Sequence, residues 1–181
     1  MNRSVFEMVD LHKLWLLGDP RGERANFRKM NLRWVDLSFQ DLRQADLSQA
    51  KLHGCYLFGA DLQGAQMPPL KLPSSGQITG YKKVIGGIIL ELLIDDAPRT
   101  GSYVGTKCRC SRAKVIAAYK DGVKMDTQDG QEFCSIFQYR FKYKMGEWVE
   151  EPNYDGDPRV ECAPGIHFFM TKEEAEEYSY P

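Results

Sequence analysis

The sequence lacks a long hydrophobic run and has no excess of either charge. The apolar stretch at residues 14–17 is too short for a secretory signal or a membrane-spanning helix. With 24 Lys and Arg against 25 Asp and Glu, the chain has too little net charge for a typical nucleic-acid-binding protein. The five cysteines are an odd number without a secretory context, which favours reduced thiols. We therefore expect one or two small cytoplasmic domains that contact neither membrane nor nucleic acid.

What the sequence has instead is a repeat, because an apolar side chain occupies every fifth position from Phe27 to Leu62. In units of five that begin at residue 25, the first place is mostly small or apolar and the second is usually Asp or Asn. A period of five is neither that of an α-helix nor that of a β-strand. Short repeated units of this kind stack around a shared core. The third places, which we expect to face that core, are Phe27, Leu32, Leu37, Leu42, Leu47, Leu52, Leu57 and Leu62.

A helix is expected before the repeat, over residues 5–17. Ser4 and Glu7 have the spacing of a capping box at its start. Gly18 suits the left-handed position that ends a helix, and Pro20 follows it. Since a stacked repeat exposes its core at an uncovered end, residues 1–24 are predicted to cap the first repeats.

The run WLLGDPRGERANF, followed by units of the form A-D-L-x-x, resembles the pentapeptide-repeat proteins over about residues 15–72. The resemblance implies a short right-handed quadrilateral β-helix over residues 25–72, with four units in each of about two coils. It also implies that Cys55, in a first place, points inward and is inert. The inner stacks that it implies are Phe27 with Leu47 and Met67, Leu32 with Leu52 and Leu72, Leu37 with Leu57, and Leu42 with Leu62. So short and weakly charged a block is not expected to mimic DNA, as long acidic members of the family do.

Residues 73–79 read as a linker rich in Pro, Ser and Gly, and residues 80–181 as a small α+β domain of antiparallel strands. Its strongest signal is a hairpin, in which residues 81–85 and 88–94 flank two glycines. The whole chain is thus predicted to be mainly β, with a capping helix at the N-terminus and a second helix near the C-terminus.

Three more strands are predicted in this domain, over residues 107–119, 133–144 and 166–170. Thr171 and Glu174 form a second capping-box pattern, which predicts that the last helix begins there. Strict alternation in the second of these strands would place aromatic side chains on one face and basic ones on the other. The aromatic face would hold Phe133, Phe137, Tyr139, Phe141 and Tyr143.

The segments KCRCSRAKVI and VECAPGIHFFMTKEEAEEY resemble an uncharacterised domain that follows pentapeptide repeats in bacteriophage and bacterial proteins. The resemblance covers about residues 80–178 and implies a phage or prophage context. It implies no activity, because none is established for that domain.

Four side chains could form a structural zinc site, namely Cys108, Cys110, Cys162 and His167. The C-x-C spacing is not that of a usual zinc knuckle, so buried reduced thiols are the favoured interpretation. Cys162 and His167 could also form a nucleophile–base pair, although no Asp or Asn is obviously placed to orient the imidazole. We predict no catalytic residue, no metal and no cofactor.

Two surfaces could bind a partner. The outward fourth or fifth places hold Trp34, Phe39 and Phe58, with Gly54 and Gly59 predicted to lie over the first two rings. Exposed aromatic side chains mark interfaces, unless the capping helix or the second domain covers them. Two basic clusters are read mainly as solvated faces; they comprise Arg140, Lys142 and Lys144, and Lys107, Arg109, Arg112 and Lys114.

Together these features predict a non-enzymatic protein-binding module of phage or prophage type. Its partner would be a host protein or protein complex, and capture would inhibit a host enzyme or defence complex. The binding residues would be the three outward aromatics, with Arg140, Lys142 and Lys144 as steering charges. The alternative is a thiol- or zinc-dependent enzyme, or a small-ligand binder, centred on Cys108, Cys162 and His167. The sequence sets no oligomeric state.

Overall fold

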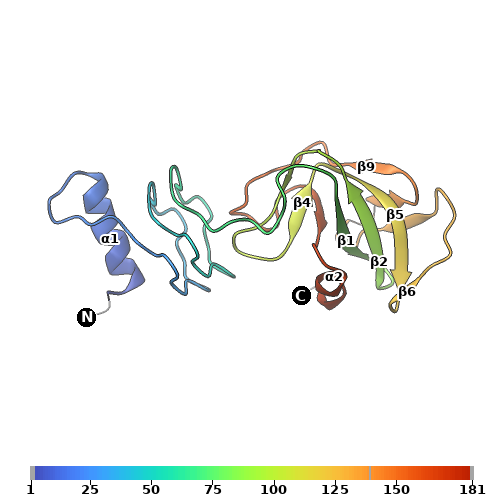
Figure 1. The fold of residues 1–181 in the computed structure, drawn as a ribbon, viewed down its shortest axis with the longest axis horizontal. Coiled ribbons are helices and arrows are strands. Elements are labelled where there is room, and N and C mark those ends of the chain that lie inside the picture. The colour runs from blue at the N-terminus through green and yellow to red at the C-terminus, as the bar shows by residue number, and fades with distance from the viewer. Residues whose placement is uncertain (1–2, 139, 180–181) are drawn as a thin grey trace. The chain divides into compact units, whose positions relative to one another are not determined.

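The structure is a computed structural model that describes residues 3–138 and 140–179. The chain is mainly β, with two helices and antiparallel sheets (Figure 1). It divides into two compact units: unit 1 is Met1–Leu70 with Tyr103–Gly105, and unit 2 is Lys71–Ser102 with Thr106–Pro181. Neither helix in the described residues has the length and apolar character needed to cross a membrane.

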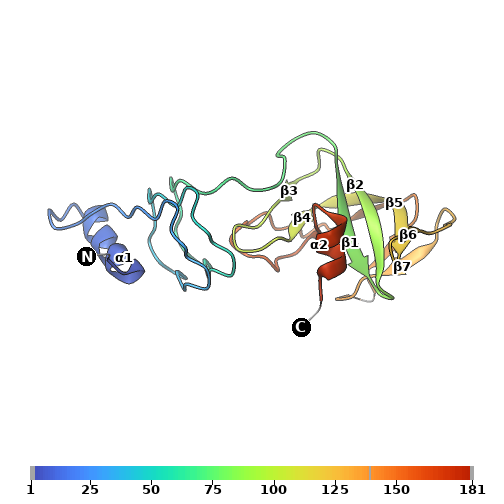
Figure 2. The same cartoon turned by 60° about the horizontal axis from the view of Figure 1, so that its bottom comes forward.

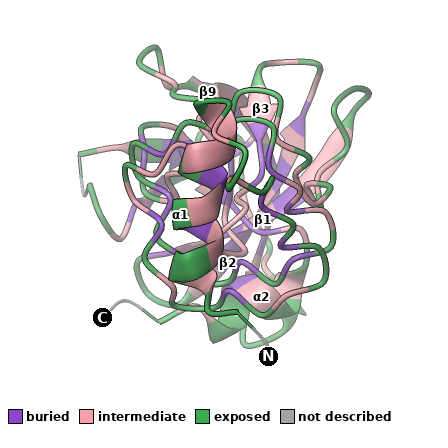
Figure 3. Cartoon of the chain, turned by 90° about the vertical axis from the view of Figure 1, so that its left-hand side faces the viewer, coloured by how far each residue is buried: buried purple, intermediate pink, exposed green. Residues whose placement is uncertain are grey.

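Unit 1 begins with helix α1, Val5–Leu16, which starts where predicted and ends one residue earlier than predicted. The Ser4 side chain accepts the Glu7 N–H while the Glu7 carboxylate accepts the Ser4 N–H, which confirms the capping box. Gly18 has φ +75°, and the N–H of Asp19 donates to the Leu14 carbonyl at 3.0 Å, as in a Schellman motif. Figure 3 shows α1 with pink and green segments, because only Val9 and His12 of this helix are buried.

His12 joins α1 to the repeat. Its Nδ1 accepts the N–H of Ala25 at 3.1 Å, so the ring proton of the neutral imidazole lies on Nε2. Nε2 then donates to the carbonyl of Arg43 at 3.1 Å. Trp15 stacks on the imidazole with ring centroids 5.5 Å apart. Burial lowers the pKa of His12, because the charged form would lose both water and its acceptor role towards Ala25.

The repeat is joined by parallel bridges between residues twenty positions apart, the first of them Asn26 with Asp46. Within the described residues these bridges are isolated, so the repeat contains no continuous strand and no closed sheet. The third places are buried from Phe27 to Leu57 and Leu62 is half-buried, which confirms the predicted inner row. Leu72 does not continue that row, because it packs against the core of unit 2.

Each pentapeptide ends in a left-handed residue. The fifth places have φ between +58° and +71°. In every unit the N–H of the next first place donates to the third-place carbonyl, as in the 2.9 Å bond from Met30 to Phe27. Positive φ at the third residue of a four-residue turn is the signature of a type II turn. The fifth places are Lys29, Trp34, Phe39, Gln44, Gln49, Gly54, Gly59 and Gly64.

The side chains of the second places stabilise these turns by hydrogen bonds to the backbone. Six of them are Asn or Asp, and each side chain accepts the N–H two residues later, as Asp36 does from Ser38 at 2.9 Å. The two second places without such a side chain are Lys51 and Tyr56. Their turns have Gly at the fifth place, where positive φ carries no steric cost.

The last part of unit 1 comes from far along the chain. Tyr103 and Val104 pack against the buried cluster of the repeat. The Gly54 N–H donates to the Val104 carbonyl at 2.7 Å. Residues 103–105 therefore supply backbone and apolar contacts that residues 1–70 do not contain.

Unit 2 is built on a sheet with the order β1-β2-β5-β6, with β9 also paired to β5. β1 (Ile78–Val84) and β2 (Ile88–Ile94) confirm the predicted hairpin, although three residues rather than two form its loop. A second sheet has the order β10-β4-β3, and β7 pairs with β8 alone. The remaining strands are β3 (Arg99–Thr100), β4 (Cys108–Cys110), β5 (Arg112–Lys120), β6 (Val123–Lys124), β7 (Glu132–Cys134), β8 (Lys142–Lys144), β9 (Trp148–Glu150) and β10 (Ile166–Phe168).

The predicted strand over residues 107–119 is wrong, since β4 and β5 lie in different sheets. The break is at Ser111, whose N–H donates to the Pro98 carbonyl and whose own carbonyl accepts the N–H of Glu151. Its backbone groups therefore bond outside both strand pairs.

The predicted strand over residues 133–144 is also wrong, because the chain reverses between β7 and β8. Phe133 pairs with Tyr143, and both are buried. Odd-numbered residues pair with odd-numbered residues in this register, so alternation by itself could not distinguish a long strand from a hairpin. Phe137, on the loop, is largely exposed, and Tyr139 lies outside the described residues.

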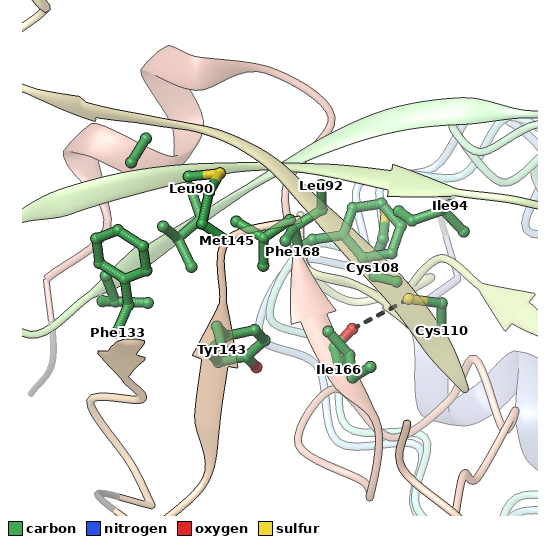
Figure 4. Close-up of a cluster of buried hydrophobic side chains, with 14 residues drawn as sticks. Leu90, Leu92, Ile94, Cys108, Cys110, Phe133, Tyr143, Met145, Ile166 and Phe168 are labelled. Atoms are coloured by element: carbon green, nitrogen blue, oxygen red, sulfur yellow. Dashed lines mark hydrogen bonds between the residues drawn. The ribbon is translucent and has the colours of Figure 1, made fainter. Parts of the chain in front are cut away.

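The core of unit 2 lies where these elements meet. Figure 4 shows Phe133, Tyr143 and Phe168 with the apolar side chains of β2. The Cys110 thiol donates to the Ile166 carbonyl at 3.8 Å across the β4–β10 pair. Gly80 on β1 leaves room for the Phe168 ring, because an added Cβ would lie 2.3 Å from it.

Helix α2, Lys172–Glu177, lies beside β1 (Figure 2). Thr171 caps it by accepting the Glu174 N–H at 3.2 Å. That is one half of the predicted capping box.

Replacing Gly59 with Ala should destabilise unit 1 more than replacing Gly64 with Ala. Both glycines have positive φ, so both changes should cost about 1 kcal/mol of backbone strain. At Gly59 the new Cβ would also lie 2.5 Å from the Phe39 ring, whereas at Gly64 the nearest atom is 3.5 Å away. Overpacking should add roughly 1 kcal/mol or more for Gly59→Ala. Urea unfolding of both variants measures this, and equal losses would show that the ring does not rest on Gly59.

The contribution of His12 to stability should disappear in acid. Because its pKa is lowered in the folded protein, the unfolded chain takes up the proton first as pH falls below about 6.5. The difference in unfolding free energy between the wild type and His12→Gln should therefore shrink between pH 7.5 and pH 5. Other titrating groups cancel in this difference. A difference that stays constant or grows would contradict the lowered pKa.

Candidate functional site

Four aromatic side chains of the repeat are exposed, and three of them are the predicted outward rings. Trp34, Phe39 and Phe58 have exposed fractions of 67%, 71% and 60%. We call these three side chains the aromatic surface. The capping helix therefore does not cover these rings. Their exposure is unusual, because apolar rings are normally buried away from water.

The rings of the aromatic surface contact glycines and each other. An added Cβ at Gly54 would lie 2.3 Å from the Trp34 ring, and one at Gly59 would lie 2.5 Å from Phe39. This confirms that the two glycines lie against those rings. Phe39 and Phe58 meet edge to face with centroids 5.4 Å apart.

Two of these aromatics also occupy strained backbone. Trp34 has φ +64° and Phe39 has φ +58°. For a bulky residue the left-handed region costs about 1–2 kcal/mol, and Gly or Asn would fit it better. The sequence thus places large rings where both exposure and backbone conformation disfavour them, although the positive φ itself is shared by every fifth place of the repeat.

The predicted steering charges lie around the β7–β8 hairpin. Lys142 and Lys144 both pair with Glu132, the latter at 3.6 Å. Arg140 is exposed in the loop before β8. Glu132 reduces the net charge of this group, so a steering role stays a prediction.

The second basic cluster is not a surface stripe. Arg109 is buried, and its guanidinium donates to four backbone carbonyls of a single loop. Arg112 pairs with Asp95 and lies over the Trp148 ring at 4.7 Å. The carbonyls that Arg109 holds are those of Asp155, Asp157, Val160 and Glu161.

The four side chains of the alternative zinc site are not brought together. Across residues 3–138 and 140–179, no three His, Cys, Asp or Glu side chains are placed to hold a metal ion. Cys108 and Cys110 face the core of unit 2, and burial raises their pKa values to about 11 and about 12. Cys55 is likewise buried, with its pKa raised to about 11. Burial therefore favours the protonated form of these three thiols at neutral pH, which makes them poor nucleophiles.

Cys162 and His167 do not form the nucleophile–base pair either. The Nε2 atom of His167 lies 2.9 Å from the Ala163 carbonyl, which can only accept, so Nε2 carries the proton. Burial, with a smaller effect of Lys82, lowers the pKa of His167 to about 4. The exposed Cys162 thiol accepts instead from Lys107 Nζ at 3.7 Å.

These last residues line a cavity of about 300 Å³ in unit 2. It lies between β1, the β7–β8 hairpin and the segment before β10. Its lining combines aromatic, cationic and small side chains, with Glu151 as an acidic member. The residues around it are Lys82, Lys107, Ser135, Phe137, Gln138, Phe141, Tyr143, Glu151, Cys162, Ala163, Pro164, Gly165 and His167.

Lys82 is the residue that sequence reasoning missed here. It lies on the inward face of β1, between Gly80 and Val84, and is 7% exposed. Burial lowers its pKa to about 8. Two adjacent lysines in a predicted strand were the available signal, because alternation must turn one of them inward.

The comparisons with known proteins agree with this division of the chain. Residues 41–67 match a family model described as pentapeptide repeats (8 copies), and residues 68–175 match a family of unknown function, DUF5758. No curated protein and no solved structure matches the chain. The second match covers more than half of the sequence and agrees with the predicted fusion of repeats to an uncharacterised domain. The chain therefore belongs to DUF5758, a family of unknown function, and carries pentapeptide repeats before the family domain.

Proposed function

We propose that this chain is a non-enzymatic protein-binding module and that the aromatic surface of unit 1 is its docking face. The observation that carries the proposal is the exposure of Trp34 and Phe39 at left-handed positions. Large aromatic side chains supply most of the binding energy in many interfaces, because they bury a large area with few rotatable bonds. Their exposure has a cost in the free chain that a partner would remove.

We further infer that the repeat is a short right-handed quadrilateral β-helix, as the family resemblance implies. The twenty-residue spacing of the parallel bridges supports this, because four pentapeptides then complete one turn. A rigid backbone of this kind would hold the rings at fixed positions, so little side-chain entropy would be lost on binding.

The phage-type resemblance adds the expectation that the partner is a host protein or protein complex, such as an enzyme or a defence complex, which capture inhibits. A thiol- or zinc-dependent activity is not proposed. The separation of Cys108 from Cys162 and the engaged Nε2 of His167 argue against it.

Replacing the aromatic surface should abolish binding without unfolding the protein. Asn is suited to left-handed backbone, so in Trp34→Asn and Phe39→Asn the relief of strain should offset much of the lost ring packing. We expect the unfolding free energy to change by about 1 kcal/mol or less for each. Proteins that bind the wild type in a bacterial lysate should be lost, and affinity for a purified one should fall by a factor of about 30 or more.

Phe6→Asn is the matched control. Phe6 is another exposed aromatic of unit 1, at 57%, but it lies on α1 and outside the aromatic surface. This variant should keep every partner. Retention of all partners by the Trp34 and Phe39 variants, or equal loss by the Phe6 variant, would refute the proposed docking face.

A further inference from the structure

The cavity of unit 2 contains more positive than negative charge. Lys82 and Lys107 line it, and Glu151 is the carboxylate beside them. The Glu151 carboxylate accepts the backbone N–H of Asn153 at 3.1 Å. In the part of the chain that the structure describes, neither lysine forms an ion pair with any carboxylate. Glu161 acts electrostatically on Lys107 and helps to raise its pKa, whereas no described carboxylate affects the pKa of Lys82 in this way. The Lys82 ammonium is therefore the charge without a counter-ion.

The buried ammonium of Lys82 lowers the stability of the fold. Its Nζ donates to the His167 carbonyl at 3.0 Å and lies 5.4 Å from the centroid of the Tyr143 ring. An ammonium has three N–H donors, so among the described residues two remain for another acceptor. A buried charge without a counter-ion is strongly disfavoured, and an apolar residue at this position of β1 would avoid that cost.

Lys107 places a second ammonium at the same cavity. Its Nζ lies 4.8 Å from the Tyr178 ring centroid and 5.9 Å from that of Phe137. Lys107 contributes to lowering the pKa of Lys82, so the two charges repel each other in the free protein. An anion between the two ammonium groups would be attracted to both and would offset their repulsion.

The remaining walls are suited to an apolar ring. Phe137, Phe141 and Tyr143 line the cavity, which is at the small end of the range for ligand sites. A nucleotide or a peptide would need more room. Arg109 helps to fix the wall, because it holds the loop that leads into Cys162 by its carbonyls.

We propose that this cavity binds a small organic anion, a carboxylate or a phosphate ester with a single ring, through the ammonium groups of Lys82 and Lys107. The anionic group accepts from the remaining donor sites of Lys82 and is attracted by the Lys107 ammonium. The ring lies against the aromatic wall. This site is independent of the aromatic surface of unit 1, so either assignment can fail alone.

Calorimetric titration of the full chain at pH 7.0 tests the charge requirement. Phenyl phosphate and benzoate represent the two anionic classes, and benzyl alcohol is their neutral counterpart. We expect phenyl phosphate or benzoate, or both, to bind at least tenfold more tightly than benzyl alcohol. Equal binding of charged and neutral probes would overturn the proposal. Inorganic phosphate that binds as tightly as phenyl phosphate would overturn the assignment of an organic ligand.

Lys82→Met tests the residue without threatening the fold. Methionine keeps the length of the stem and removes a buried charge, so the variant should unfold at the same or a higher temperature than the wild type. Its affinity for the anionic probe should fall at least tenfold, and Lys107→Met should have an effect in the same direction. Lys124→Met is the matched control, because Lys124 is exposed on β6 and outside the cavity. Wild-type affinity in Lys82→Met would overturn the proposal.

The pH dependence gives a second, independent test. With a Lys82 pKa of about 8, most of the ammonium is lost by pH 9.5 in the free protein. Affinity for phenyl phosphate should therefore fall by about tenfold or more between pH 7.0 and pH 9.5.

Other groups around the cavity can be separated from this effect. His167 titrates far below this range, and burial raises the pKa of Tyr143 well above its usual value. Cys162→Ser removes the thiol at the cavity, and the loss of affinity at high pH should persist in this variant. A dependence that persists in Lys82→Met instead would contradict the role of Lys82.

Discussion

The left-handed residue that closes each pentapeptide is the constraint on which unit 1 depends. Eight consecutive fifth places share nearly the same φ, so the chain turns by the same geometry every five residues. That regular turn is what keeps each third-place side chain on the inside. The apolar row by itself could not enforce this, since burial is non-directional whereas a turn fixes the direction of the backbone.

The two units contain opposite exceptions to the usual distribution of side chains. Unit 1 leaves Trp34, Phe39 and Phe58 in water, and unit 2 buries Lys82 and Arg109. Arg109 is explained by the backbone carbonyls that surround it. The exposed rings and Lys82 have no comparable compensation, and a protein tolerates such costs where a partner or ligand relieves them.

Local signals gave the parts of the fold that could be predicted. The capping box of Ser4 and Glu7, the left-handed Gly18 and the hairpin of β1 and β2 each depend on residues a few positions apart. Their hydrogen bonds join residues that are close in the sequence, so a short stretch of residues is enough to predict them. The row of buried leucines could also be predicted, because its period is unlike that of any other regular structure.

The errors came where distant segments decide the outcome. Ser111 divides β4 from β5 because its backbone bonds to Pro98 and Glu151, which no local pattern reveals. The candidate site followed the same rule. The outward rings were visible in the repeat register, whereas the positions of Lys82 and Lys107 at one cavity depend on strands and loops that meet only in the folded domain.

The interleaving of the two units along the chain limits how the protein can be dissected. A fragment that stops at residue 70 would retain every pentapeptide but lose Tyr103 and Val104, which cover the apolar cluster of the repeat. The Gly54 N–H would lose its acceptor at the same time. Excising the repeats at the apparent boundary would thus expose part of this cluster, so grafting experiments need to include this distant tripeptide.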